Sequence, residues 1–268
     1  HGSSESTGAT ETTIRLVFDS ANPTWADTTP WTSLPSEITA EFSTNQLAPL
    51  LAIRLVLGIA KDEPLPPIEL RLGTTRGTNA LLTRSGARTA FVTTRGFRDA
   101  LEIGDQQRPD LFALTVKKAA PLYETAVEID ERLSADGSVL QGLDPEQVRA
   151  VLERLKQAGI ESLAVCLLHA YRNPCHELEL RELAQPFGFR NVSLSHCCSP
   201  LIRLIPRAST TVLDAYLNPV LRDYVAEIES SLGSQATLLM MTSSGGLVPA
   251  AQFSGKDSVL SGPAGGVV

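Results

Sequence analysis

The sequence predicts an α/β protein in which a mostly parallel, mixed sheet is flanked by helices. Three segments, Arg88–Thr94, Ser162–Leu168 and Asn191–Ser195, are short and contain an apolar run or alternating apolar residues, as expected for buried strands. Segments with helical periodicity begin at Asp144 and Asn173, between successive strands. Buried strands that alternate with helices are typical of a parallel sheet.

Composition restricts the class of protein. A chain of 268 residues with 43% hydrophobic and 20% charged residues is long enough for one large or two medium domains. The net charge of −7 argues against nucleic-acid binding, which needs clustered Lys and Arg. The longest apolar stretch, Leu47–Ala60, contains Arg54 and is shorter than the roughly 20 residues that cross a bilayer. With no signal peptide recognisable, we expect a cytoplasmic protein and no membrane partner.

The four cysteines do not have the spacing of a disulfide framework, and Cys197 and Cys198 are adjacent. Reduced thiols are therefore expected. Two of the cysteines lie near histidines and could form a zinc site with them. The four residues are Cys166, His169, Cys175 and His176. Their spacing differs from that of known zinc sites, so we expect structural histidines and no metal.

Residues 1–13 are rich in Ser, Thr, Gly and Glu, so we expect a disordered lead-in. The elements expected after it are a strand over Ile14–Asp19, a helix over Gln46–Ile59, a strand over Ile68–Leu72 and a helix over Thr78–Arg84. Thr75 or Thr78 would cap the last helix.

The helix that begins at Asp144 carries the clearest start signal, with a capping residue, Pro145 and Gln147. Its apolar residues predict one buried stripe: Val148, Val151, Leu152 and Leu155. The later elements expected are a long helix over Thr210–Leu232, bent at Pro219, strands over Thr237–Met241 and Ser258–Leu260, and a small-residue helix that begins near Ser261.

The stretch Leu72–Arg108 concentrates the polar residues, and we expect its strand, turn-to-helix, strand and loop to face one site. The Gly/Thr turn after the first strand can present N–H groups and hydroxyls at the carboxyl end of a strand, where α/β sheets bind ligands. The charged loop after the second strand contains Phe97, Leu101 and Ile103, which suggests partial burial. Near the long helix, Arg203, Arg207, Thr210 and Thr211 could bind an anion or cap the helix.

Six segments together resemble the hydantoinase A/5-oxoprolinase family, and they occur in the family's order between Leu72 and Val268. They are GTTRGTNALL, GARTAFVTTRGFRDALEIGDQQRPDLF, LLHAYRNPCHE, PRASTTVLDAYLNP, SSGGLVPAAQFSG and VLSGPAGGVV. The resemblance is greatest to the single-chain ATP-dependent 5-oxoprolinase branch. It divides the chain into a hydantoinase/oxoprolinase N-terminal-like domain, 14–199, and the beginning of a hydantoinase A-like domain, 200–268.

The resemblance implies an actin/hexokinase-like ATPase fold of the ribonuclease H-like type, with ATP and Mg²⁺ bound between two lobes. It implies ATP-dependent opening of a cyclic amide, such as 5-oxo-L-proline in glutathione metabolism. An amide is a poor electrophile, and phosphorylation of its oxygen would allow water to attack the carbon.

The resemblance also assigns roles to residues. The substrate-facing residues would be Gly73, Thr74, Thr75, Thr78, Asn79, Arg95, Asp99, Glu102 and Arg108. The nucleotide-facing residues would be Ser243, Gly245 and Gly246, in a turn where Ser244 replaces the family's usual Asp. No catalytic residue is assigned.

The family's two main phosphate loops, of the types DxGGTFTD and DMGGTSTD, are not recognisable in this chain. We therefore expect a fragment, inactive alone, that works with the remaining hydantoinase A and hydantoinase B-like parts, fused or separate, and a homo-oligomer at full length. The substrate would be a lactam or an imide. The alternatives are an ATP-dependent ketone carboxylase subunit and a non-catalytic structural or partner-binding domain.

Overall fold

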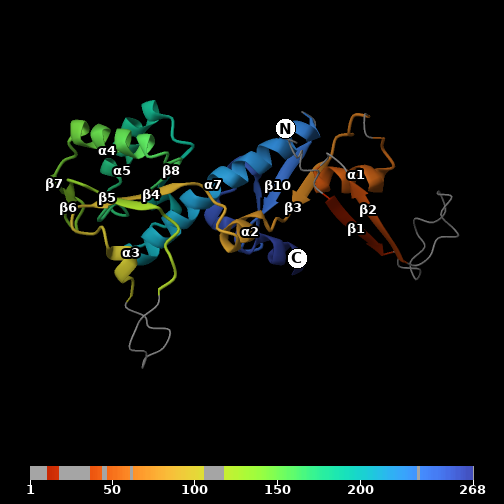
Figure 1. Cartoon of the computed structure of the whole chain (residues 1–268), viewed down its shortest axis with the longest axis horizontal. Coiled ribbons are helices and arrows are strands. Elements are labelled where there is room, and N and C mark those ends of the chain that lie inside the picture. Colours follow the sequence, from red (N-terminus) through yellow and green to blue (C-terminus); the bar gives the residue numbers. More distant parts are fainter. Residues whose placement is uncertain are drawn as a thin grey trace, which may run out of the picture. The chain divides into compact units, whose positions relative to one another are not determined.

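The computed structural model describes residues 11–17, 37–43, 47–60, 63–105, 118–233 and 236–267 (Figure 1). The chain forms two compact units. Unit 1 comprises residues 1–68 and 228–236, and unit 2 comprises residues 69–227 and 237–268. The domain boundary expected after residue 199 stays a prediction. Among the described residues, no helix is both long and apolar enough to cross a membrane.

Unit 1 contains an antiparallel pair, β1 (Glu11–Val17) and β2 (Glu37–Ser43), in which Glu11 lies opposite Ser43. The expected strand near Ile14 is confirmed, although it starts earlier, so Glu11–Thr13 do not belong to a disordered lead-in. Residues 1–10 lie outside the described residues. The expected helix is confirmed as α1 (Ala48–Leu57), and it ends at Gly58, whose φ of +65° favours glycine.

The main sheet of unit 2 has four strands in the order β5-β4-β8-β9, and all of them are parallel. The strands are β4 (Thr89–Thr94), β5 (Thr125–Ile129), β8 (Ser162–Cys166) and β9 (Asn191–Leu194). The parallel α/β sheet predicted from the buried strands is therefore confirmed. β5 was not predicted, because its alternating sequence TAVEI lies among charged residues.

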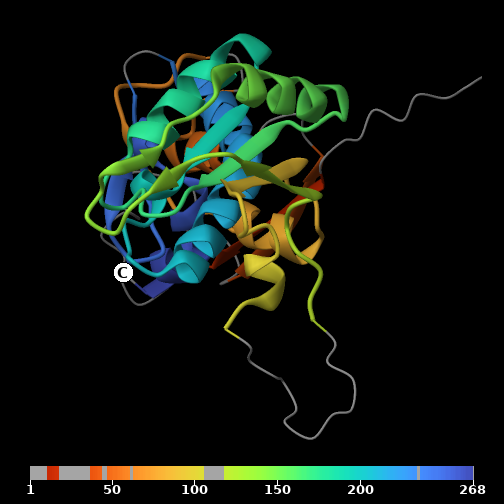
Figure 2. The same cartoon turned by 90° about the vertical axis from the view of Figure 1, so that its left-hand side faces the viewer.

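Helices cover both faces of this sheet (Figure 2). One face packs against α4 (Pro145–Gln157) and α5 (Cys175–Ala184), and the predicted α4 stripe, from Val148 to Leu155, is buried there. On the other face, Phe91 and Cys166 pack against the first turns of α7 (Leu204–Leu232). The alternation of Ala90, Phe91 and Val92 between these two cores explains why all three are apolar in a strand that is buried throughout.

The α4 start is as predicted at Asp144, whose carboxylate accepts hydrogen bonds from the N–H groups of Glu146 and Gln147. The Gln147 side chain does not close a capping box and instead bonds to Asp130 at 2.6 Å. Short elements complete this part of the chain: α3 (Ala100–Ile103), β6 (Arg132–Leu133), β7 (Val139–Gln141), a 3₁₀ turn (Gln185–Phe187) and α6 (Ser195–Cys198).

A second sheet of unit 2 has the order β11-β10-β3, with β3 (Glu69–Leu72) parallel to β10 (Thr237–Met241) and β11 (Leu247–Pro249) antiparallel. It is followed by two 3₁₀ turns, Ala250–Gln252 and Gly255–Asp257, and by α8 (Ser261–Val267). The expected strand over Ser258–Leu260 is wrong. These residues form the tight turn before α8, where the Ser261 N–H bonds to the Ser258 carbonyl.

Helix α2 (Arg76–Leu82) begins two residues earlier than predicted, and Thr75 occupies the capping position without a side-chain hydrogen bond. It packs closely against the turn before α8. A Cβ at Gly77 would come within 3.0 Å of the Ser258 Cβ and closer still to its hydroxyl. The Ser261 hydroxyl donates to the Thr74 carbonyl at 2.8 Å. Small residues on both sides are therefore required for this contact.

The long helix α7 starts at Leu204 rather than Thr210 and continues through Pro219. Proline has no N–H for the carbonyl four residues before it. That carbonyl, of Ala215, instead accepts the Ser162 hydroxyl of β8 at 2.7 Å, and the next carbonyl, of Tyr216, accepts the Ala87 N–H at 2.9 Å. The proline thus frees an acceptor through which the main sheet is attached to α7.

A fully buried carboxylate, Glu177 in α5, connects the ends of β8 and β9. One of its oxygens accepts the Leu167 N–H at 3.0 Å and the Ser195 hydroxyl at 2.5 Å. The other accepts the His196 N–H at 3.1 Å and contacts His196 Nδ1 at 2.6 Å. A buried carboxylate is costly unless such donors surround it, so these contacts hold the loops in place.

We expect Glu177→Gln to lower the free energy of unfolding by about 2–4 kcal/mol, because it keeps the shape but replaces an acceptor with a donor that faces donors. Urea denaturation measures this. The control is Glu182→Gln, an exposed residue of the same helix, which should change stability by less than about 0.5 kcal/mol. Equal stability of the two variants would contradict this account of Glu177.

Gly77→Ala should destabilise the protein by about 1–3 kcal/mol, because the added methyl group overlaps Ser258, whose hydroxyl is bonded to the Gly255 carbonyl. Gly142→Ala is the matched control, since a Cβ there meets nothing within 4 Å. Thermal unfolding of the two variants compares them. A melting temperature that is unchanged in Gly77→Ala would show that the α2 contact tolerates a side chain.

Candidate functional site

The turn after β4 is held against β5 by one carboxylate. Glu128 of β5 accepts hydrogen bonds from the N–H groups of Gly96, at 2.8 Å, and Arg98, at 3.2 Å. The φ of +92° at Gly96 suits glycine. Arg95 N–H continues the sheet by bonding to the Ile129 carbonyl at 3.0 Å. The backbone of the charged loop is therefore fixed, and the side chains that follow it have a defined position.

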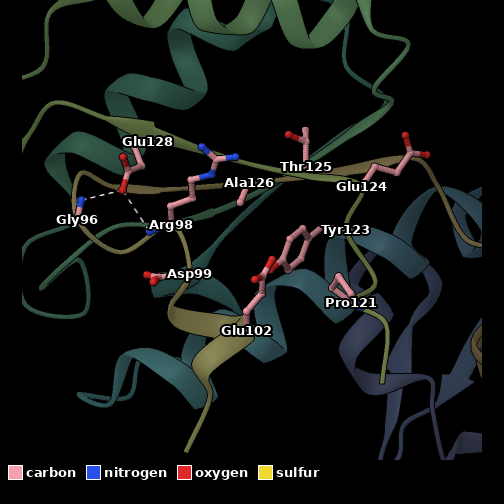
Figure 3. Close-up of a pocket in the computed structure, with 10 residues that line it drawn as sticks. All are labelled: Gly96, Arg98, Asp99, Glu102, Pro121, Tyr123, Glu124, Thr125, Ala126 and Glu128. Atoms are coloured by element: carbon pink, nitrogen blue, oxygen red, sulfur yellow. Dashed lines mark hydrogen bonds between the residues drawn. The ribbon is translucent and has the colours of Figure 1, made fainter. Parts of the chain in front are cut away.

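A cavity of about 530 Å³ lies between this turn, α3 and the edge strand β5 (Figure 3). Its volume is in the usual range for a small-molecule site. The cavity is lined by Gly96, Arg98, Asp99, Glu102, Pro121, Tyr123, Glu124, Thr125, Ala126 and Glu128. These residues belong to one unit and come from both sides of residues 106–117 in the sequence.

Tyr123 is the buried polar residue of the cavity. Its side chain is 7% exposed, and its ring packs on Phe91 with 5.6 Å between centroids. Among the described residues its hydroxyl has no hydrogen-bond partner. Burial raises the pKa of Tyr123 above its usual value, and the negative charge of Glu102 raises it further. The hydroxyl therefore stays protonated and is available as a donor.

The charged residues of the cavity differ in whether they have partners. Glu124 is paired with Arg88 through two hydrogen bonds of 2.8 and 2.9 Å, and the Arg88 hydrogen bond lowers the pKa of Glu124. Within the part of the chain that is described, the side chains of Arg98, Asp99 and Glu102 have no hydrogen bond or ion pair. One guanidinium and two carboxylates are thus free to meet a ligand.

The predicted substrate-facing residues are only partly brought together. Asp99 and Glu102 line the cavity. Arg95 does not, because its guanidinium pairs with Asp130. Arg108 lies outside the described residues. The expectation that the whole stretch Leu72–Arg108 faces one site is not supported by the sheets, since β3 and β4 belong to different ones.

The Gly/Thr turn after β3 is occupied by protein contacts. Thr74 is buried, with its hydroxyl accepting from the Arg76 N–H at 3.1 Å, and the Thr78 hydroxyl donates to the Val259 carbonyl. A Cβ at Gly73 would come within 3.1 Å of the Ser261 carbonyl oxygen. Thr75 and Asn79 are exposed, and their side chains remain available. Substrate contact at this turn stays a prediction.

The turn predicted to contact nucleotide is also bonded internally. The Ser243 N–H and hydroxyl both donate to the Asp257 carbonyl at 2.7 Å, and the Gly245 N–H donates to the Thr242 carbonyl. The Gly246 carbonyl accepts from Thr242. This arrangement does not fit a phosphate held by Ser243 and Gly245, so we derive no chemistry for ATP or Mg²⁺ from it. Nucleotide binding here stays a prediction.

His176 has structural surroundings, whereas the buried Nδ1 of His169 has no hydrogen-bond partner among the described residues. His176 is buried and contacts Glu131 at 2.6 Å, and Glu131 also accepts the Thr94 hydroxyl. Cys166 faces the core on the α7 side. In the described ranges, no three His, Cys, Asp or Glu side chains are grouped as a metal site would require, and all four cysteines are free.

The residues near the start of α7 were expected either to bind an anion or to cap the helix. Arg207 does neither. It is 1% exposed, its guanidinium donates to the carbonyls of Leu167, at 2.7 Å, and Leu201, at 3.0 Å, and it lies over the Tyr171 ring. The hydroxyls of Thr210 and Thr211 bond to carbonyls of their own helix. Arg203 precedes the helix and is exposed.

Sequence reasoning did not identify Tyr123, and it noted Arg98 only as part of a charged cluster. Tyr123 precedes β5, the strand that was not predicted. The alternation in Thr125–Ile129, with a tyrosine before it, was the available signal, because a strand there must pair beside β4 and bring the tyrosine to the charged loop.

Comparison with known proteins gives the family. Residues 24–188 match the hydantoinase/oxoprolinase N-terminal region, and residues 207–268 match a second family model, hydantoinase/oxoprolinase. A 5-oxoprolinase of Saccharomyces cerevisiae is 41% identical over 259 residues, covering 82% of this chain and 20% of that protein. The chain thus spans about a fifth of the length of this curated relative.

Two solved structures are similar in fold. The ATP-dependent caprolactamase from Pseudomonas jessenii has a TM-score of 0.70 and 25% identity, with 85% of this chain and 36% of that chain covered. A nucleotide-free acetone carboxylase has a TM-score of 0.72 at 22% identity, with 86% and 36% covered, and shows the fold alone. Multi-subunit carboxylases also occur among the relatives. On the strength of both family matches, the chain belongs to the hydantoinase/oxoprolinase family.

Proposed function

We propose that this chain is part of an ATP-dependent hydrolase that opens a cyclic amide, such as 5-oxoproline. The observation that carries the proposal is the 41% identity over 259 residues with a 5-oxoprolinase. The fold likeness to an enzyme described as an ATP-dependent caprolactamase supports the same substrate class, because caprolactam is also a lactam.

The chemistry of the substrate explains the need for ATP. Resonance makes an amide a poor electrophile, and phosphorylation of the amide oxygen would give an imidate-like phosphate ester whose carbon water can attack. Cleavage of the ring C–N bond would then leave an acyl phosphate, and a second water would release the phosphate. In the proposed protein, ATP and Mg²⁺ bind within an actin/hexokinase-like ATPase fold, chiefly at the two phosphate loops that are not recognisable in this chain. The remaining hydantoinase A and hydantoinase B-like parts, fused or separate, would complete the enzyme.

The described residues support the substrate half of this proposal. The cavity beside β5 holds unpaired charges of both signs, and its volume of about 530 Å³ suits a small polar molecule. Asp99 and Glu102, which we propose as substrate-facing residues, lie at its wall. The four free cysteines are consistent with a reducing compartment, and we propose the cytoplasm.

A ketone carboxylase is the second candidate, favoured by the 34% identity over 210 residues with an acetophenone carboxylase gamma subunit of Aromatoleum aromaticum. Ketone carboxylation would also use ATP, but its substrate has no amide N–H. The higher sequence identity to a 5-oxoprolinase, 41% against 34%, favours the lactam. The two candidates differ in which compound stimulates ATP hydrolysis.

With the intact protein and any partner subunit present, we expect 5-oxo-L-proline to stimulate ATP hydrolysis and to be converted to L-glutamate. Release of ADP and of glutamate measures this, and acetone with bicarbonate serves as the comparison. Stimulation by the ketone with carboxylate formation, and none by a panel of lactams and imides, would refute the hydrolase and favour the carboxylase. No stimulation by either would leave a structural or partner-binding role.

A further inference from the structure

Tyr123 carries an unmet hydrogen-bonding requirement at the wall of the cavity beside β5. A hydroxyl moved out of water without a partner costs free energy, so such groups are rare in folded proteins. The Tyr123 hydroxyl is in this state, with its ring fixed on Phe91 and its tip beside Glu102 in Figure 3. A ligand that accepts a hydrogen bond, such as a carbonyl group, would satisfy it.

Arg98 differs from its neighbouring arginines. Arg88 is engaged by Glu124, and Arg95 by Asp130. The guanidinium of Arg98 has neither an ion pair nor a hydrogen bond among the described residues, although its own N–H is fixed by Glu128. Figure 3 shows its side chain extending toward β5 on the Ala126 side of the cavity. A guanidinium placed on a fixed backbone suits a carboxylate, which it binds through two parallel hydrogen bonds.

The carboxylate of Glu102 supplies the third group. It lies on α3, and Figure 3 shows it directed toward Tyr123, whereas Asp99 points away from both. A carboxylate is an acceptor only, so it suits an N–H donor of the ligand. Glu102 and Tyr123 together therefore match an N–H and a carbonyl that are neighbours, as in an amide. The apolar wall near Ala126 would contact the carbon skeleton.

We propose that the cavity beside β5 binds a small carboxylate that also contains an amide, with the carboxylate on Arg98, the amide N–H on Glu102 and the amide oxygen on the Tyr123 hydroxyl. The compound that fits this pattern within the proposed function, on which the choice of ligand rests, is 5-oxo-L-proline. Arg98 would then decide between lactams that carry a carboxylate and lactams that do not, whereas Tyr123 would bind the amide oxygen of both.

Two ligands distinguish binding of the carboxylate by Arg98 from binding of the amide by Tyr123. Calorimetric titration of the intact protein with 5-oxo-L-proline, and with 2-pyrrolidinone, which lacks the carboxylate, is done with a non-hydrolysable ATP analogue and Mg²⁺. Arg98→Gln should weaken 5-oxo-L-proline binding about 10- to 100-fold and change 2-pyrrolidinone binding less than about twofold. Arg149→Gln, an exposed residue of α4, is the control and should change neither.

Tyr123→Phe should weaken both ligands by a similar factor, about 3- to 10-fold, because both contain the amide oxygen. The phenyl ring keeps the packing on Phe91, so the variant should fold, and circular dichroism checks this. Tyr171→Phe, at a ring outside the cavity lining, is the control.

Unchanged affinity for 5-oxo-L-proline in both Arg98→Gln and Tyr123→Phe would overturn the cavity assignment, even where ATP hydrolysis supports the proposed function. Absence of 5-oxo-L-proline binding by the wild-type protein would also overturn it. Arg98-dependent binding without stimulated ATP hydrolysis would support the cavity and refute the hydrolase. The two proposals can therefore fail separately.

Discussion

Buried carboxylates that accept backbone N–H groups are the constraint on which the main sheet and its loops depend. Glu177 is fully buried, and its four contacts come from the ends of β8 and β9 and from α6. Parallel strands end with unsatisfied polar groups at one edge, and a carboxylate there satisfies several of them together. The loops at this edge are accordingly fixed by these hydrogen bonds as well as by apolar packing.

Carboxylates also position the candidate site, although Glu128 is only partly buried. Glu128 holds the turn after β4 through the N–H groups of Gly96 and Arg98. The backbone from which the Arg98 side chain extends therefore has a fixed position. Glu131, bonded to Thr94 and His176, holds the end of β4 from the other side. A rigid backbone with unpaired side chains is suited to binding, because little ordering remains to oppose it.

Much of the fold could be predicted from the sequence, because burial leaves a periodic pattern. The α4 stripe and the apolar strands β4, β8 and β9 follow from that pattern. The strand β5 was missed, since the sequence of an exposed edge strand is mixed and the alternation in Thr125–Ile129 is a weak signal. For Ser258–Leu260 the error was the opposite: a strand was predicted where the structure has none. These residues form a tight turn in which Ser258 packs against Gly77, and Leu260 is 57% exposed.

The candidate site could be predicted only in part. Asp99 and Glu102 were identified by the crowding of charge after a buried strand, and both line the cavity. The sequence does not show that Arg95 is engaged by Asp130, because that contact joins two loops far apart in the chain. Nor does it show that the Gly/Thr turn packs under Ser261. Which polar groups are left without partners is decided by tertiary structure.

The central claim is that the cavity beside β5, and not the turn after β3, receives the substrate. A crystal structure of the intact protein soaked with 5-oxo-L-proline tests it most directly. The account predicts ligand density between Arg98 and Tyr123, with the carboxylate at the guanidinium. Density at Thr75 and Asn79, with an empty cavity beside β5, would contradict it.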